Sequence, residues 1–546
     1  MPSLSNILVL AALALGALAP PARAQAPTHT LEPPDNGASR LFGIEVAAVP
    51  DSDGDGLADL LVGAYSTSVN GVTRVGQAHL YSGATGALLR TLDSPNPRQD
   101  GLFGFSVAGV PDADGDGRGD LVIGAVHELV VGINPGRAYL FSGATGALLR
   151  SLTSPNGTLL GEFGHAVSGI ADVNGDGRGD LLVGANRENV GNASQSGRAY
   201  VFSGATGTLL HTLTRPTAQA NAYFGAAVAG VPDADGDAVG DLLVGAFWNS
   251  GAFSRMGAAY LFSGASGAHL HTLTSPNPEQ NGYLGYSVAG LTDVNGDGRG
   301  DLLVSAQAED GGAPGAGRAY VFSGSDGALL RTLLSPTPEN SGIFSESVSG
   351  IPDVDGDGVG DLLIGAALEN GGLSDAGRIH VFSGASGAHL GSLQSPNPRT
   401  VEQLGNFGDA VAGVPDVNGD GRGDLLIGAP RETIGTEPSG RTYLFSGDAI
   451  ATDAAPAPAG AAFALRATPN PARVATMLAF TLDQPGPVRL TLYDALGREV
   501  AVLLDGVHRA GPHEAALDAS ALRPGLYLAR LEADGRAVTR RVTVAR

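Results

Sequence analysis

The chain has 546 residues, a formal net charge of −23 and no cysteine. This length suits one large domain with a smaller one, and the 43% hydrophobic content permits a packed core, which argues against disorder. The lack of cysteine excludes disulfides, zinc–thiolate sites and thiol nucleophiles. Stability outside the cell would then have to come from packing or from bound metal.

Residues 1–24 have the pattern of a secretory signal peptide. The apolar run ILVLAALALGALA precedes PPARA, whose small residues suit a cleavage site, although the segment MPSLSN before it has no basic residue. A spanning helix needs about 20 apolar residues, and this run is shorter. A cleaved signal is therefore favoured over an uncleaved membrane anchor, and no later segment suits a membrane span.

One unit of about 60 residues recurs seven times along the chain. After an FG-like pair, each of the first six copies contains four runs that predict strands A to D, such as FSVAGV, DLVIGA, RAYLFSG and ALLRSL. Alternation predicts strands with one buried face, whereas the continuous apolar run of strand B predicts burial on both faces. Four short antiparallel strands per repeat are typical of a β-propeller blade. Twelve of the 17 phenylalanines occupy the FG and FSG positions, so we expect them to pack between blades.

The last unit lacks a strand D, and the missing segment lies at the other end of the chain. HTLEPPDNGASRLFG, residues 29–43, aligns with RTLDSPNPRQDGLFG, residues 90–104. Pairing the two ends in one blade would close the ring and remove an unpaired sheet edge. The sequence therefore predicts an all-β fold, with a seven-bladed β-propeller over residues 28–447 that the N-terminal strand closes. A linear solenoid is the alternative, but it would need capping repeats, which are absent.

Between strands A and B, all seven copies carry the ladder D-x-[DN]-G-D-[GA]-x-x-D. Calcium takes six to eight oxygen ligands, and glycines let a loop turn tightly enough to aim carboxylates and carbonyls inward. Position 12, a glutamate in an EF-hand, is Val or Ile here, so position 9 supplies the last ligand. One such loop is compatible with an ordinary hairpin turn, but seven with the same spacing predict up to seven Ca²⁺ ions. The predicted ligands, with a carbonyl at each seventh position, are Asp51, Asp53, Asp55, Leu57, Asp59; Asp112, Asp114, Asp116, Arg118, Asp120; Asp172, Asn174, Asp176, Arg178, Asp180; Asp233, Asp235, Asp237, Val239, Asp241; Asp293, Asn295, Asp297, Arg299, Asp301; Asp353, Asp355, Asp357, Val359, Asp361; and Asp416, Asn418, Asp420, Arg422, Asp424.

Two details of the ladder carry further expectations. The tripeptide Arg118-Gly119-Asp120, which many adhesion proteins display to receptors, overlaps the second loop, and the same tripeptide occurs in three other loops. Because the motif ends in Asp with Gly before it, we expect Asp120 to be a calcium ligand and not a receptor contact. Ala238 replaces glycine at position 6 of the fourth loop, and if that position requires a positive φ, this site should be the weakest.

The FG pair, the ladder and the Gly-Ala after strand B (Gly63-Ala64, Gly428-Ala429-Pro430) resemble the FG-GAP repeat of integrin α-subunit propellers. The resemblance covers about residues 28–447. It implies a seven-bladed propeller with calcium in the A–B loops on its lower face. This chain departs from the animal members because all seven copies carry the ladder and no integrin leg domains follow.

The C-terminal part has a different composition. Residues 448–462 are rich in Ala and Pro and predict a linker, and alternating segments in residues 463–546 predict a small β-sandwich. The runs PNP, LYDALGREV and LDASALRPGLYLARLE with a basic tail resemble the C-terminal sorting domain of the bacterial type IX secretion system. The resemblance implies recognition by the secretion machinery, then secretion or attachment to the outer cell surface of a bacterium. A generic Ig-like or fibronectin-like spacer domain is the alternative.

No catalytic constellation is recognised, because the sequence contains no nucleophile elbow, phosphate loop or HExxH motif. The B–C and D–A connections should share one face, and the B–C loops vary most, which suits a binding surface. Trp248 and Phe253 lie in one such loop, and we expect them to bind a protein or glycan, with packing against a neighbouring blade as the alternative for Trp248. Nucleic acid is not expected, because the basic residues of the C-terminal part are mixed with acids.

The sequence therefore favours an exported calcium-binding module for surface binding or adhesion. A cell-surface enzyme that cleaves polysaccharides or esters on the B–C loop face is one alternative. A structural component of a surface layer is another.

Overall fold

The computed structural model describes residues 26–34, 41–130, 135–369, 376–397, 405–434 and 437–451 of the larger part of the chain. In the C-terminal part it describes residues 465–468, 475–482, 486–494, 498–508, 511–519, 522–523, 525–533 and 536–544. The predicted signal peptide, residues 1–24, lies outside the described residues. The chain forms two compact units, residues 1–453 and 454–546, and each is described by itself.

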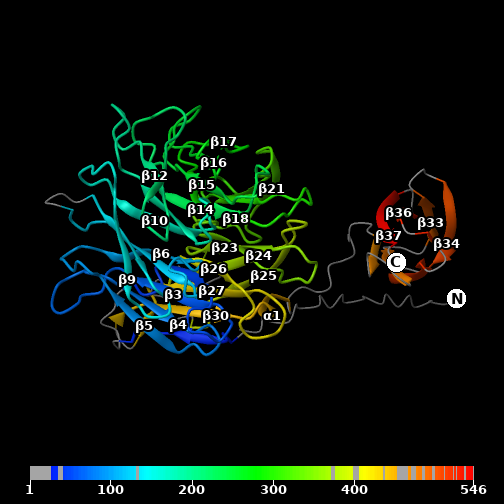
Figure 1. Cartoon of the computed structure of the whole chain (residues 1–546), viewed down its shortest axis with the longest axis horizontal. Coiled ribbons are helices and arrows are strands. Elements are labelled where there is room, and N and C mark those ends of the chain that lie inside the picture. The colour runs from blue at the N-terminus through cyan, green and yellow to red at the C-terminus, as the bar shows by residue number, and fades with distance from the viewer. Residues whose placement is uncertain are drawn as a thin grey trace, which may run out of the picture. The chain divides into compact units, whose positions relative to one another are not determined.

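The first unit consists of four-stranded antiparallel sheets, as the repeat predicts (Figure 1). The continuous apolar run forms the second strand in every sheet, and all residues of these strands are buried. Within the described residues the sheets are β2 (Glu45–Val49), β3 (Asp59–Ala64), β4 (Gln77–Tyr81), β5 (Leu88–Asp93); β6 (Phe103–Val110), β7 (Asp120–Ala125), β8 (Arg137–Phe141), β9 (Leu148–Thr153); β10 (Phe163–Ile170), β11 (Asp180–Ala185), β12 (Arg198–Phe202), β13 (Leu209–Leu213); β14 (Ala227–Val231), β15 (Asp241–Gly245), β16 (Ala259–Phe262), β17 (His269–Leu273); β18 (Leu284–Leu291), β19 (Asp301–Ala306), β20 (Arg318–Phe322), β21 (Leu329–Leu333); β22 (Val348–Ile351), β23 (Asp361–Ala366), β24 (Arg378–Phe382), β25 (His389–Gln394); and β26 (Val411–Val414), β27 (Asp424–Ala429), β30 (Arg441–Phe445), β1 (His29–Leu31).

The last of these sheets takes its outer strand from the other end of the unit. β1 pairs antiparallel with β30, with His29 opposite Leu444 and Leu31 opposite Thr442. At the inner edge of the same sheet, β26 packs against β2. Figure 1 shows the blue strands β3 and β4 beside the yellow strands β27 and β30. The pairing of β1 with β30 is the one that the sequence predicts.

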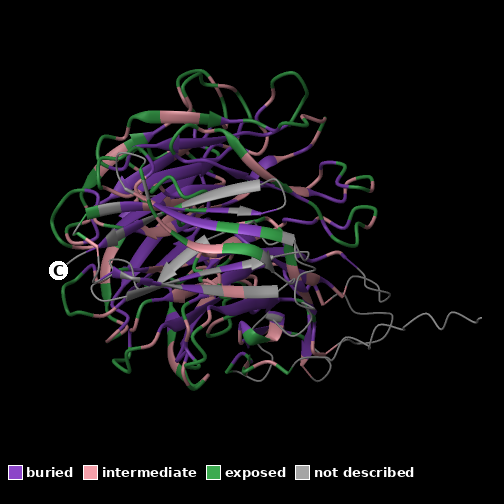
Figure 2. Cartoon of the chain, turned by 90° about the vertical axis from the view of Figure 1, so that its right-hand side faces the viewer, coloured by how far each residue is buried: buried purple, intermediate pink, exposed green. Residues whose placement is uncertain are grey.

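Aromatic residues fill the space between neighbouring sheets. The first strands of consecutive sheets pack against one another all the way around the unit, and Figure 2 shows the strands as mostly buried. Phe103 and Phe141 are buried and meet edge to face, with ring centroids 6.0 Å apart, in a cluster that also contains Leu61 and Leu80 of the adjacent sheet. Such pairs contribute about 0.5–1.5 kcal/mol beyond the burial of their area. The predicted role of the FG and FSG phenylalanines is confirmed, and so is the all-β propeller.

Two short elements follow the seventh ladder. β28 (Thr433–Ile434) and β29 (Glu437–Pro438) pair within the last B–C loop, and helix α1 (Asp448–Ala451) follows β30. Ile450 of α1 is buried in the cluster that contains Leu393 of β25. One apolar side chain therefore fixes α1 to the propeller, and the linker over residues 448–462 stays a prediction.

The second unit contains two sheets with one core. The first sheet has the order β31 (Leu465–Thr468), β32 (Ala475–Leu482), β35 (Gly511–Asp518), and the second has the order β34 (Glu499–His508), β33 (Gly486–Asp494), β36 (Gly525–Ala533), β37 (Arg536–Val544). Leu478 and Leu517 of the first sheet share a buried cluster with Leu490, Leu531 and Val542 of the second. Two sheets that share one core form a β-sandwich, as predicted.

Candidate functional site

The seven ladders fold into similar turns, of which the second is representative. The backbone N–H groups of Gly115 and Gly117 donate to the carboxylate of Asp112 at 2.5 and 3.0 Å, and that of Arg118 donates to Asp116 at 2.8 Å. Equivalent bonds recur in the other loops, as from Gly419 and Gly421 to Asp416. These bonds hold the carboxylates of one loop close together.

The aspartate at position 9 connects the ladder to a second hairpin. Asp120 is fully buried, and its two carboxylate oxygens accept from the N–H of Ala113 at 2.8 Å and from that of Gly143 at 3.1 Å. Gly143 lies between β8 and β9, so the A–B and C–D connections share one face. Burial raises the pKa of Asp120 to about 6 and that of Asp361 to about 7, so a nearby cation would compensate a costly negative charge.

Three acids converge in four of the loops, where one oxygen from each residue lies within 4.8 Å of the others. These groups are Asp51, Asp53, Asp59; Asp112, Asp114, Asp120; Asp233, Asp235, Asp241; and Asp353, Asp355, Asp357. The donors are hard oxygens, which suit Ca²⁺ and not a soft metal.

The other three loops carry asparagine at position 3. The amide nitrogens of Asn174, Asn295 and Asn418 donate to the position-9 aspartate at 3.3, 3.2 and 2.8 Å. The amide oxygen of each asparagine accepts from the backbone N–H of the position-5 aspartate, so a cation would share that oxygen and displace the bond from the amide nitrogen to position 9. These loops still offer hard oxygen donors at positions 1, 3, 5 and 9, which suit calcium.

The tripeptide at residues 118–120 is held by the fold. A Cβ atom on Gly119 would lie 2.3 Å from the carbonyl oxygen of Pro50, so only glycine permits this approach of the preceding sheet. The guanidinium of Arg118 donates to Asp51 at 2.6 Å, and Asp120 is buried. All three residues therefore stabilise the loop and its contact with the preceding sheet. This agrees with the prediction that the tripeptide belongs to the loop and is not a receptor contact.

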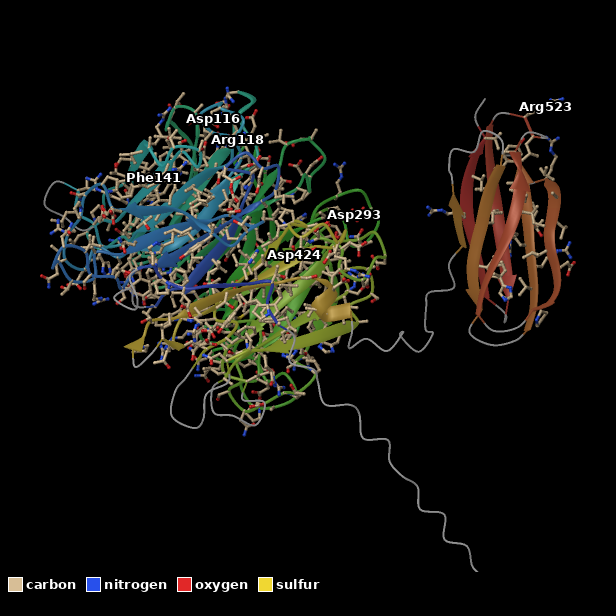
Figure 3. All side chains as sticks on the ribbon, turned by 90° about the horizontal axis from the view of Figure 1, so that it is seen from below. Asp116, Arg118, Phe141, Asp293, Asp424 and Arg523 are labelled. Carbon is tan, nitrogen blue, oxygen red and sulfur yellow. The ribbon has the colours of Figure 1, made fainter. Side chains whose placement is uncertain are left out.

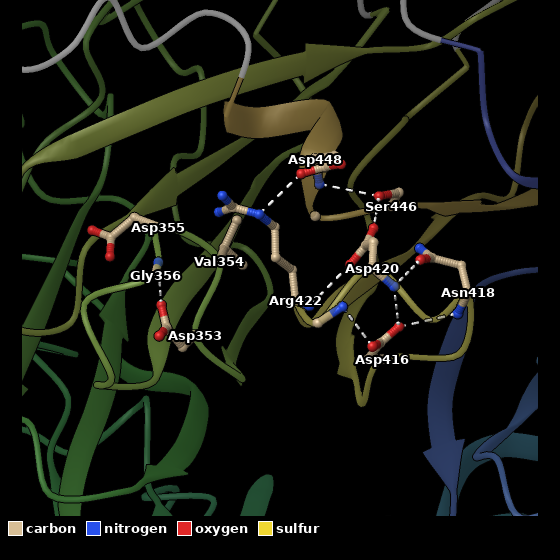
Figure 4. Close-up of polar contacts among 12 residues, drawn as sticks. Asp353, Val354, Asp355, Gly356, Asp416, Asn418, Asp420, Arg422, Ser446 and Asp448 are labelled. Carbon is tan, nitrogen blue, oxygen red and sulfur yellow. Dashed lines mark hydrogen bonds and ion pairs between the residues drawn. The ribbon is translucent and has the colours of Figure 1, made fainter. Parts of the chain in front are cut away.

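Arginines at position 7 connect consecutive ladders. Besides Arg118, which Figure 3 labels, Arg178 reaches Asp112 at 2.9 Å and Arg299 reaches Asp233 at 2.8 Å. The seventh loop differs, because Arg422 instead pairs with Asp448 of α1 at 2.9 Å (Figure 4). The sequence predicted only a carbonyl role for these residues and missed the contacts of their side chains.

Ala238 adopts a backbone conformation that disfavours alanine. Its φ is 72°, and glycine at the same position of the second loop, Gly117, has a φ of 81°. A Cβ on Gly117 meets no atom within 4 Å, so the cost is conformational and not steric. The expectation that position 6 requires a positive φ is confirmed.

We therefore expect Ala238→Gly to raise the free energy of unfolding by about 1 kcal/mol, because glycine adopts this φ without strain. Urea denaturation in the presence of calcium measures the change. Gly117→Ala is the matched control and should lower stability by a similar amount. A loss of stability in Ala238→Gly would contradict the proposed backbone strain at Ala238.

The opposite face contains a set of buried glutamates that the sequence analysis missed. Glu128 is fully buried after β7, and the hydroxyl groups of Tyr139 and Ser94 donate to its carboxylate. Ser94 follows β5, so these bonds join a B–C loop to a D–A connection. These glutamates could have been found by aligning the repeats, because a glutamate recurs three residues after the alanine that ends strand B. The equivalent residues are Glu188, Glu309, Glu369 and Glu432.

A cavity of about 570 Å³ opens among the same connections. Trp248 lines it, half-buried, with the ring of Tyr223 edge-on at 4.8 Å and the guanidinium of Arg255 4.1 Å from its centroid. Phe253 is 45% exposed and does not line the cavity. The structure therefore assigns the two predicted contact residues to different parts of this face.

Two family models match parts of the chain. The FG-GAP repeat matches residues 163–202, 284–322, 344–382 and 407–445, and the secretion system C-terminal sorting domain matches residues 467–545. The chain therefore contains FG-GAP repeats and a sorting domain, which confirms both predicted resemblances. The sorting domain indicates export to the bacterial cell surface or secretion. None of the helices in the described residues has the length and apolar character to cross a membrane.

Integrin α-subunits are among the similar curated proteins. Integrin alpha-5 of Xenopus laevis is 32% identical over 222 residues, which cover 38% of this chain and 20% of that protein. Integrin alpha-IIb of Homo sapiens is 35% identical over 237 residues, which cover 40% of this chain and 21% of that protein. This chain thus spans about one fifth of the length of these relatives.

Proposed function

We propose that this protein is an exported, calcium-binding β-propeller that serves as a binding or adhesion module at the cell surface or outside the cell. The observation that carries the proposal is the difference between the loops on its two faces. Seven loops with one donor pattern gather on one face, and the varied loops surround a cavity on the other. A repeated rigid scaffold with varied loops suits recognition.

Each calcium ion would be held by the side chains at positions 1, 3, 5 and 9 of one loop and by the position-7 carbonyl. Bound calcium would neutralise carboxylates that otherwise repel one another. In this proposal the signal peptide comprises residues 1–24, the propeller residues 28–447, and the sorting sandwich residues 463–546. Release of the mature protein and its attachment to the surface are both compatible with this organisation.

Trp248 is proposed as an anchor for the ligand, because it lines the cavity and remains partly exposed. Trp248→Ala should weaken binding at least about tenfold, since buried aromatic anchors dominate interface energies. The measurement is binding of the calcium-loaded mature protein to a glycan and protein array. Leu148→Ala is the matched control, because Leu148 is 44% exposed at the start of β9, after a C–D hairpin of the other face.

Unchanged binding of Trp248→Ala to every captured ligand would end the anchor proposal. The same preparation should be incubated with a panel of polysaccharides and esters. Cleavage of any member would favour the alternative of a surface hydrolase or lyase. No cleavage together with specific capture would support the binding module.

A further inference from the structure

The wall of the cavity is built largely from one position of the repeat. The residue directly after each FG-like pair lines the cavity in all seven repeats. Five of these residues are apolar or aromatic, namely Ile44, Phe105, His165, Ala226 and Tyr286. The sixth and seventh are Glu346 and Asp409. The FG pair before this position and the strand that follows it are nearly constant, so the variation here indicates a surface shaped for a ligand and not for folding.

The aromatic and acidic residues occupy different parts of the wall. Phe247 packs against Trp248 and Tyr286, with ring centroids 6.0 and 5.3 Å away. The acids come from neighbouring sheets, because Glu346 precedes β22, Asp409 precedes β26 and Glu45 begins β2. The cavity therefore presents a broad aromatic surface on one side and three carboxylates on the other.

These carboxylates have little compensation within the protein. Among the described residues, no hydrogen bond or ion pair reaches the carboxylates of Glu45 and Glu346. Within the same part of the chain, Asp409 accepts only a long bond of 3.5 Å from the side chain of Asn406. Burial, with repulsion from Asp409, raises the pKa of Glu45 and of Glu346 to about 8, and Arg431 opposes this shift for Glu346. Both carboxyls therefore hold a proton at neutral pH until a bound cation compensates their charge.

A neutral acceptor in the same wall is also left without a donor. Asn186 is 3% exposed and lines the cavity, and within the described part of the chain its Oδ1 atom has no hydrogen-bond partner. Buried acceptors are nearly always satisfied, so an empty one points to a ligand that donates. The cavity thus combines several unused acceptors with an aromatic surface.

Two positive groups near the cavity are engaged by other residues. Arg187 pairs with Glu162 at 3.0 Å and stacks on Tyr223, and Arg255 stacks on Trp248. Both cations therefore lie on the aromatic side. On the side of the acids, Arg431 lies close enough to lower the pKa of Glu346 and of Asp409. Three acids face this one arginine, so a positively charged ligand group would still be directed to their side.

We propose that this cavity binds an amino sugar, with its ammonium group at Glu45, Glu346 and Asp409 and its ring against the aromatic wall. Carboxylates form strong charge-assisted hydrogen bonds with an ammonium, and aromatic faces attract both cations and the apolar faces of sugar rings. The volume lies within the range of about 300–1,000 Å³ for small-molecule sites, and an ammonium alone would fill little of it. The inference rests on the proposed binding function and names the ligand class of that face.

The test is titration calorimetry of the calcium-loaded mature protein with three probes: a glucosamine trimer, its fully N-acetylated counterpart, and benzylamine. We expect the glucosamine trimer to bind, and the acetylated trimer to bind at least about tenfold more weakly, because acetylation removes the charge. Glu346→Gln should weaken binding of the glucosamine trimer about tenfold. The double variant Glu346→Gln, Asp409→Asn should weaken this binding further. Thermal melting checks that each variant is folded.

Asp100→Asn is the matched control, because Asp100 is a half-exposed acid of a D–A connection, paired with Arg74 and outside the cavity. This variant should bind the trimer like the wild type. Equal binding of the acetylated trimer, or normal binding by the folded double variant, would overturn the ammonium site. Tighter binding of benzylamine than of the trimer would contradict the proposed contact between the sugar ring and the aromatic wall.

No binding of any probe at concentrations up to about 10 mM would overturn the whole inference. The proposed function would then still stand if the array yields a ligand whose capture depends on Trp248. If neither the probes nor the array yields a ligand, both fail together.

Discussion

Chelation of calcium with EGTA should lower the Tm of the mature protein by more than about 15 °C. A ligand at 100 times its Kd stabilises the folded state by about 2.7 kcal/mol per site, and the chain offers seven loops of one pattern. Without the ions, the carboxylates of each ladder repel one another, and the buried aspartate at position 9 is left with an uncompensated charge. Scanning calorimetry with and without EGTA measures the shift.

Magnesium is the control for this experiment. It requires near-ideal octahedral geometry and keeps its water, so the same concentration of Mg²⁺ should restore much less of the Tm than Ca²⁺ does. A melting curve that EGTA leaves unchanged would contradict the stabilising role of calcium. Equal rescue by both ions would contradict the proposed selectivity.

Leu31→Ala should lower the free energy of unfolding by about 2–5 kcal/mol, the usual cost of a large cavity in a well-packed core. Leu31 is 1% exposed and belongs to the cluster that contains Phe42 and Leu444, where the first and last parts of the propeller meet. The substitution therefore removes packing at the junction of the two chain ends. Urea denaturation in calcium measures the loss.

Thr30→Ala is the matched control, because Thr30 lies on the same strand and is exposed. It should change stability by less than about 0.5 kcal/mol. Deletion of residues 26–31 should have a larger effect than either substitution and should promote self-association, because it leaves β30 as an unpaired edge. If Leu31→Ala were no more destabilising than Thr30→Ala, β1 would not close the sheet.

The strands were predictable because their pattern is local and repeated. A continuous apolar run such as DLVIGA removes its side chains from water only when the strand is covered on both faces. Seven copies of the run show its place in the repeat. The position of β1 was predictable for the same reason, since residues 29–43 match an internal segment. Ala238 was predictable because the glycine that it replaces recurs in the other loops.

The features that the sequence analysis missed depend on contacts between distant segments. Arg118 reaches Asp51 across 67 residues, and no local pattern encodes that pairing. Glu45, Glu346 and Asp409 face one cavity only because the first and last sheets are neighbours. Ile450 anchors α1 within a segment whose Ala and Pro content is typical of a linker. In each case the missing information is the three-dimensional arrangement of the sheets.

The most direct test of the account is the calcium content of the mature protein after exhaustive dialysis, measured by mass spectrometry of the metal. We expect bound calcium that approaches seven ions per chain. We also expect about one ion fewer when Asp112, Asp114 and Asp120 are all replaced by Ala in a variant that remains folded. Calcium no higher than in the dialysis buffer, or a content unchanged by these substitutions, would contradict it.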